Sequence, residues 1–172
     1  MNSVNTPKYV IFMQDAAATN YAGMRYGFCT CLLDNAYYAN SANGAYSSIT
    51  LLDEFNFNLG APIAGPNNPS NGTNSSGGLT VWSNGVWRRD FQNGIILVNP
   101  RGNHPNGVGV GATVTLTDQN GNPATYWHLR ASSYANQDPT VNNGAAVTSV
   151  TMPDPNVAGT GGSGLVLSRT PT

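Results

Sequence analysis

Apolar residues near the N-terminus follow two different patterns in succession. Residues 8–14 are a short run of strand-forming residues without regular alternation, which is typical of a strand buried on both faces of a parallel sheet. Thr19 or Asn20 could then cap a helix, which the spacing predicts from about Tyr21 to Leu33. The apolar residues at helical spacing are Met24, Phe28, Cys31 and Leu32.

A third apolar stretch completes a βα arrangement. Residues 34–48 are rich in Asn, Ala, Ser and Tyr and contain an Asn43-Gly44 turn, and residues 49–59 return to apolar and aromatic side chains. We therefore predict a strand or an extended rim segment over 49–59. Because one such unit can neither close a sheet nor bury both of its faces, residues 1–60 are expected to form an incomplete α/β segment.

The composition changes after residue 60. The stretch 61–78 is dominated by Gly, Pro, Asn and Ser, and its low hydrophobicity leaves little to offset the entropy of ordering. The sequence therefore predicts a linker at residues 61–78, between the α/β segment of residues 1–60 and a second domain at residues 79–172.

The second domain has the pattern of short strands joined by turns. Asn84-Gly85 and Asn93-Gly94 are strong hairpin signals. The strands predicted around and after them are 79–82, 86–91 and 95–98 in a meander, then 108–117, 125–130, 145–152 and 164–168, with a turn at 120–123. The absence of helical periodicity favours a sandwich or barrel-like sheet. We expect a mostly β fold: an antiparallel β-sandwich module preceded by the short α/β segment.

Charge and cysteine content exclude several kinds of partner. Charged residues make up only 9% of the chain, against about 25% in typical soluble domains, and they form no basic stripe of the kind that binds nucleic acid. No apolar run is long enough to span a membrane. Cys29 and Cys31 are interpreted as core residues, and His104 and His128 lie far apart, so neither a metal nor a cofactor is expected.

Two glycosylation sequons lie in the linker, at residues 71–73 and 74–76. They indicate a surface loop more firmly than secretion, because sequons arise easily in a chain this rich in Asn, Ser and Thr. The location of the protein stays open, with an extracellular or cell-surface site favoured.

Few carboxylates are available for catalysis. A glycosidase needs two carboxyl groups flanking the scissile bond, and Glu54, the only glutamate, follows Asp53. Asp15 follows the first strand, and α/β barrels place catalytic groups at such strand ends. Neighbouring residues of a strand point to opposite faces, so Asp53 and Glu54 address one substrate only if the backbone turns there. The alternative is capping, or a salt bridge with Arg25 or with an arginine of the β module.

Three tryptophans are candidates for binding a sugar. Trp82, Trp87 and Trp127 could stack on a sugar face while the indole N–H finds a polar partner, and packing in the sandwich core or between domains is the alternative. Strand alternation would let either Arg88 or Arg89 leave the sheet towards a neighbouring domain.

Two stretches of the chain resemble the C-terminal part of TIM-barrel glycoside hydrolases. The first comprises residues 24–28 (MRYGF), 32–38 (LLDNAYY), 52–55 (LDEF) and 59–62 (LGAP), and the second is 86–100 (VWRRDFQNGIILVNP). The resemblance covers about residues 9–100 in the order of the family. It implies that residues 8–60 correspond to the last βα portion of a barrel and the rest to its appended β domain.

The resemblance also implies a carbohydrate substrate and hydrolysis by carboxylates, with Asp53 and Glu54 as rim candidates. Most of the barrel is absent, so the chain alone is expected to be inactive, or to be completed by other chains through its incomplete N-terminal segment. Two other functions remain open from the residues. One is a glycan-binding or adhesion module, and the other is a shell or fibre subunit.

Overall fold

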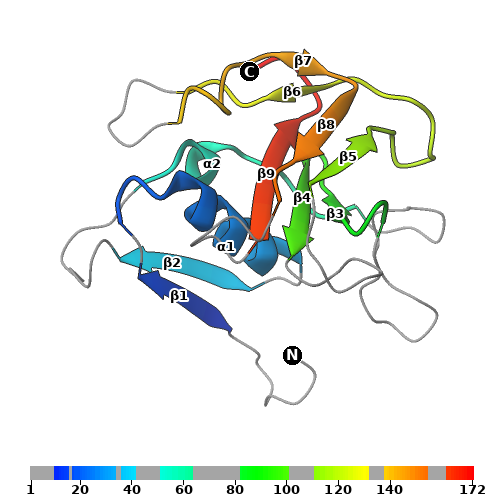
Figure 1. The fold of residues 1–172 in the computed structure, drawn as a ribbon. Helices are drawn as coiled ribbons and strands as arrows, with labels where there is room; N and C mark the ends of the chain where they lie inside the picture. Colours follow the sequence, from blue (N-terminus) through cyan, green and yellow to red (C-terminus); the bar gives the residue numbers. More distant parts are fainter. Residues whose placement is uncertain are drawn as a thin grey trace.

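The computed structural model describes residues 10–15, 17–33, 36–41, 51–63, 82–100, 111–131, 138–154 and 162–172 (Figure 1). Strands dominate this part of the chain, which confirms the prediction of a mostly β fold with antiparallel sheets. In chain order the elements are β1 (Ile11–Asp15), α1 (Tyr21–Leu33), β2 (Tyr37–Ser41), α2 (Asp53–Asn56), β3 (Trp87–Asp90), β4 (Gly94–Pro100), β5 (Ala112–Thr115), β6 (Tyr126–His128), β7 (Ala146–Val147), β8 (Ser149–Met152) and β9 (Gly162–Ser168).

The first three elements form a βαβ unit. β1 and β2 pair in parallel, from Ile11 opposite Tyr37 to Asp15 opposite Ser41, and α1 makes the connection between them. The predicted helix is confirmed, and Asn20 is its cap because its side-chain oxygen accepts a hydrogen bond of 3.0 Å from the backbone N–H of Gly23.

The second strand of this unit lies earlier than we predicted. It is residues 37–41, directly after α1, where two tyrosines favour extended backbone. The prediction of a strand over 49–59 is wrong, because residues 53–56 form the short helix α2. Asp53 and Glu54 occupy its first turn, a position that favours acidic side chains. The expected Asn43-Gly44 turn and residues 49 and 50 lie outside the described residues.

The main sheet has five strands in the order β3-β4-β9-β6-β7, and each neighbouring pair is antiparallel. The β3–β4 hairpin forms as predicted. The Asn84-Gly85 turn also forms, with positive φ angles of 48° and 80°, which Asn and Gly adopt more readily than other residues.

Within the expected meander β3 and β4 are neighbours, and residues 79–81 of its first strand lie outside the described residues. β9, the last strand of the chain, lies between β4 and β6, so the second neighbour of β4 comes from the C-terminus. Of the first expected strand only Trp82 is described, and its N–H bonds to Val86. The single strand predicted over 145–152 is divided between β7 of the main sheet and β8, which pairs with β5 in a separate two-stranded sheet.

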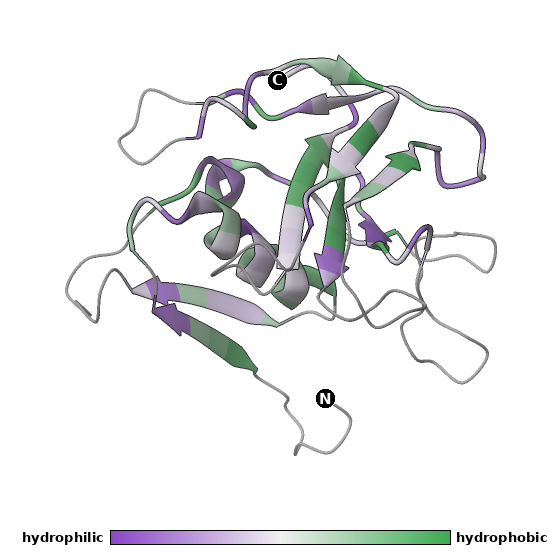
Figure 2. Cartoon of the chain, in the orientation of Figure 1, coloured by the Kyte–Doolittle hydropathy of each residue, from purple (hydrophilic) through white to green (hydrophobic). Residues whose placement is uncertain are grey.

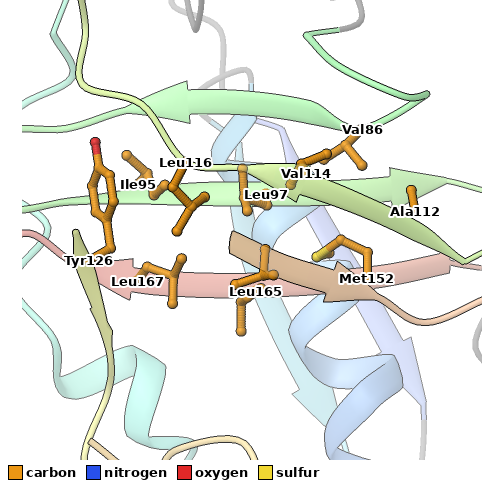
Figure 3. Close-up of a cluster of buried hydrophobic side chains, with 11 residues drawn as sticks. Val86, Ile95, Leu97, Ala112, Val114, Leu116, Tyr126, Met152, Leu165 and Leu167 are labelled. Atoms are coloured by element: carbon orange, nitrogen blue, oxygen red, sulfur yellow. The ribbon is translucent and has the colours of Figure 1, made fainter. Parts of the chain in front are cut away.

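Both faces of the main sheet are covered. Ile95 and Leu97 of β4 pack in a cluster with side chains of β5 and β8 (Figure 3). Ile96 and Val98, which point to the other face, pack in a second cluster with Cys29 and Leu33 of α1. α1 thus lies between the main sheet and the β1–β2 pair (Figure 1). Neither helix of the described part is long and apolar enough to cross a membrane.

The contact between α1 and β9 depends on a glycine. A Cβ atom built at Gly164 would lie 2.5 Å from the carbonyl oxygen of Arg25 and 2.9 Å from the Cα of Tyr26. These are backbone atoms of a helix, which cannot shift without moving α1. Gly164 therefore sets how closely α1 approaches the sheet.

We predict that Gly164→Ala destabilises the protein by about 1–3 kcal/mol, the usual range for overpacking. Gly111→Ala is the matched control, because a Cβ there would lie at an ordinary 3.4 Å from its nearest neighbour. Urea unfolding followed by circular dichroism measures both variants. Equal stability of the two would contradict this account of the α1–β9 contact.

Candidate functional site

The two candidate catalytic carboxylates lie side by side in a buried position. Glu54 and Asp53 in the first turn of α2 are only 2% and 7% exposed. The side-chain amide of Asn142 donates to both, at 3.1 Å to Oε1 of Glu54 and 3.4 Å to Oδ2 of Asp53. The backbone turns here as the helix α2, so the two carboxylates can face one group, as the sequence analysis required. In the structure that group is the side-chain amide of Asn142.

Arg25 of α1 links the same carboxylates to another segment. Its Nη1 lies 3.7 Å from Oε1 of Glu54, and its Nη2 donates to Oδ2 of Asp138 at 2.7 Å. The predicted alternative of a salt bridge with Arg25 is therefore confirmed for Glu54. We refer to Arg25, Asp53, Glu54, Asp138 and Asn142 as the carboxylate cluster, and it joins α1 and α2 to the segment that precedes β7.

Burial and charge act in opposite directions on the groups around this cluster. Partial burial alone would raise the pKa of Asp138, but hydrogen bonds from Thr140 and Arg25 and the charge of Arg25 outweigh it, so the pKa lies below its usual value. Burial, reinforced by the charge of Glu54, raises the pKa of Cys29 far above its ordinary value. Cys29 and Cys31 are both buried and free, as predicted for core cysteines.

The carboxylate cluster works as a structural contact in the described part of the chain. Glu54 is enclosed and its Oε1 faces Asn142 and Arg25, so a substrate would have to displace these partners to reach that oxygen. Paired charges are what allow carboxylates to remain buried. A catalytic role for Asp53 and Glu54 stays a prediction.

A more accessible carboxylate lies at the ends of the parallel strands. Asp15 ends β1, and its Oδ1 accepts a hydrogen bond of 3.2 Å from Ser41, which ends β2. Gln14 and Tyr38 bond to each other at 2.8 Å and lie against Gly27 of α1. By strand alternation Asp15 and Ser41 point to the opposite face, away from α1.

The three tryptophans do not form one platform. Trp82 packs against the cluster beneath β5 and β8, and the guanidinium of Arg88 lies 4.7 Å from its ring centre. Trp87 packs against the cluster beneath α1, on the other face of the main sheet. Trp127 is partly buried in β6. Trp82 and Trp87 therefore could not contact the same sugar. A role of the three tryptophans in sugar binding stays a prediction.

Arg88 and Asp90 form a second buried charge network that the sequence did not indicate. Arg88 donates two hydrogen bonds of 2.9 Å to the Asp90 carboxylate, and both side chains are fully buried. Arg169 also pairs with Asp90 and donates to the hydroxyl of Tyr126. The only sequence signal was the i, i+2 spacing of Arg88 and Asp90, which places both on one face of β3.

Arg89 confirms the expectation that one arginine leaves the sheet. Its Nη1 donates to the carbonyl oxygen of Leu32 at the end of α1, which ties β3 to the α/β segment. The sequence did not identify Asp138 or Asn142, because no pattern distinguishes them from other polar residues of turns.

The described residues contain no group of three or more His, Cys, Asp or Glu that could hold a metal ion. Comparisons of the chain with protein-family models, with curated proteins and with solved structures found no match. The similarity to glycoside hydrolases therefore stays a prediction from the residues quoted above.

We predict that Asp138→Asn lowers stability at neutral pH and that this loss disappears in acid. The pKa of Asp138 is lowered in the folded protein, so its contribution is complete above the unfolded value of about 4 and is lost as the pH falls through the folded value. Urea unfolding of both proteins from about pH 7 to about pH 3 measures the difference.

Arg25→Met supplies the control in a double-mutant cycle. Without Arg25, replacing Asp138 should cost less at neutral pH. A stability difference between wild type and Asp138→Asn that stays constant into acid would show that Asp138 does not act through its charge.

Proposed function

We propose that this chain is the C-terminal portion of a carbohydrate-active protein resembling TIM-barrel glycoside hydrolases, and that it does not hydrolyse glycans alone. In this proposal β1, α1 and β2 are the end of an α/β barrel. β3 to β9 are its appended module, a β-sandwich in which β5 and β8 cover one face of the main sheet. Carbohydrate lies at the strand ends marked by Asp15 and Ser41.

The observation that carries the proposal is the exposure of the parallel pair. The large apolar side chains that are exposed in the described part are Ile11, Phe12 and Met13 of β1, Tyr37 of β2, and Leu51, which lies just before α2. Ile11 and Met13 are 63% and 66% exposed. Parallel strands are normally buried on both faces in larger sheets, and two strands alone are marginally stable. The unit has the features of a sheet that continues into further strands.

A second support is the contact between the two stretches that resemble the family. The first stretch forms α1, β2 and α2, and the second forms the β3–β4 hairpin. Cys29 and Leu33 of the first pack with Phe91 and Ile96 of the second. If the stretches mark a barrel end and its appended domain, they should share such an interface.

The position of Asp15, which is exposed beside the buried Ser41, supports carbohydrate chemistry at the strand ends. In α/β barrels the carboxyl ends of the strands carry the catalytic groups, and Asp15 and Ser41 occupy those ends on the face away from α1. A glycosidase needs a second carboxylate. A neighbouring strand of the completed barrel would supply it.

We predict that the isolated chain is retarded by a soluble polysaccharide in affinity electrophoresis and releases no reducing sugar from it. Asp15→Asn should weaken the retardation several-fold, because a carboxylate accepts hydrogen bonds from sugar hydroxyl groups more strongly than an amide does. The panel is xylan, mixed-linkage β-glucan, galactomannan and dextran. Thr125→Ala, an exposed position far along the chain in the β module, is the control.

Two results would count against the proposal. Migration unaffected by every polysaccharide would remove the carbohydrate role. Hydrolysis by the isolated chain would remove the claim that the catalytic machinery is incomplete.

The exposed face of β1 and β2 also favours a second candidate, a subunit of a larger assembly. Apolar surface of this kind promotes association between chains. We predict that the wild-type chain self-associates at high concentration and that the double variant Ile11→Thr and Met13→Thr is more monomeric, since threonine keeps the strand propensity but removes apolar area.

Light scattering coupled to size exclusion measures this difference. Thr113→Ser, on an exposed position of β5, is the matched control for a polar change on a strand. A wild-type chain that stays monomeric at high concentration would argue against an assembly subunit.

A further inference from the structure

A cavity of about 320 Å³ lies between the beginning of α1 and strands β8 and β9. Its described lining also includes His128 of β6, Thr140, Val141, Asn143 and Pro153. Neither of the strand-end residues Asp15 and Ser41 belongs to it. Its volume falls at the lower end of the range for small-molecule sites. It corresponds to about ten water molecules at about 30 Å³ each, which is space for a molecule of roughly monosaccharide size.

Both apolar and polar residues line the cavity. Its larger apolar members are Val141, Val150, Met152 and Leu165. Its residues with hydroxyl or amide side chains are Thr140, Asn143, Ser149, Thr151 and Ser163, of which Thr140, Thr151 and Ser163 already bond to Asp138, Thr113 and Pro153. A molecule with an apolar body and several hydroxyl groups matches this mixture better than a hydrocarbon does.

The charges around the cavity favour a neutral ligand. Arg25 is the only charged residue among the described residues of the lining, and its guanidinium already pairs with Asp138 at 2.7 Å and with Glu54 at 3.7 Å. An anionic ligand would compete with these two carboxylates, and the described lining residues include no carboxylate that could pair with a cation. Burial, followed by the charge of Arg25, lowers the pKa of His128, so its imidazole is neutral at neutral pH.

Two nitrogen atoms of the lining residues lack a hydrogen-bond partner among the described residues. Nη1 of Arg25 and Nδ1 of His128 are both buried without one, although Nη1 lies 3.7 Å from Oε1 of Glu54 in their ion pair. A guanidinium nitrogen can only donate, and a neutral imidazole nitrogen without its proton accepts. A hydroxyl group can serve both, because it accepts one hydrogen bond and donates another.

We propose that this cavity binds a small neutral polyol of monosaccharide size, with Arg25 and His128 binding its hydroxyl groups. Only the choice of sugars among polyols rests on the proposed function. The cavity, its charge balance and the two nitrogens without a hydrogen bond are independent of Asp15 and the strand ends.

Nuclear magnetic resonance of the whole chain tests this proposal. The imidazole signals of His128 are followed while methyl glycosides of glucose, galactose, mannose and N-acetylglucosamine, and separately myo-inositol, are added to high millimolar concentration. His104, the only other histidine, is the internal reference. We expect at least one probe to shift the His128 signals saturably.

Two variants locate the binding. Ala22→Leu fills the cavity from an exposed position of α1 that tolerates leucine, and it should weaken binding at least tenfold while leaving His128 in place. His128→Phe removes the imidazole and should also abolish binding, measured by the backbone amide shifts of residues 149–152. Thr125→Ala lies outside the lining and should bind as the wild type does, and thermal melts verify that each variant folds.

The response of His128 to the probes, in the wild type and in Ala22→Leu, supports or overturns the proposed site. Saturable shifts that Ala22→Leu weakens support the site. If myo-inositol binds and no glycoside does, the polyol site stands while the carbohydrate role proposed for the chain loses support. If no probe shifts His128, or if Ala22→Leu binds as tightly as the wild type, the proposal is overturned.

Discussion

The packing of α1 across β9 is the contact on which the arrangement of the molecule depends. Gly164 permits the close approach of the two backbones, and the apolar cluster beneath α1 then covers a face of the main sheet that would otherwise meet water. The same approach brings Arg25 into reach of Glu54 and Asp138. The α/β segment and the β strands are therefore fastened by both apolar packing and buried charge.

Charged residues are scarce in this chain, and several of those in its described part are buried. Three of its arginines, Arg25, Arg88 and Arg169, pair with buried or half-buried carboxylates. Such pairs give little net stability, because desolvation opposes their attraction, but removing one partner leaves an uncompensated charge. They therefore act as constraints on geometry. Arg88 and Asp90 fix β3 against Tyr126 of β6, and Arg25 fixes α1 against α2.

Local features of the fold followed from local sequence, and long-range features did not. The helix of residues 21–33 and the Asn84-Gly85 turn were predictable because a cap, a spacing and a turn type are encoded in a few neighbouring residues. The place of β9 between β4 and β6 was not, since neighbouring strands are usually consecutive and no local pattern marks an exception. The same limit applies to the carboxylate cluster. Its Arg25–Glu54 pair was foreseen, whereas Asp138 and Asn142 come from a distant turn.

β1 and β4 show the same sequence pattern in opposite surroundings. Both contain consecutive apolar residues without alternation, which predicts burial on both faces. β4 confirms this, because Ile95, Ile96 and Leu97 are fully buried. β1 leaves Ile11, Phe12 and Met13 exposed, and Figure 2 colours part of this outlying strand as hydrophobic. Burying each such side chain would contribute about 1.5–3 kcal/mol. A partner that covers β1 would therefore form a stable contact with it, because the sequence of β1 is that of a buried strand.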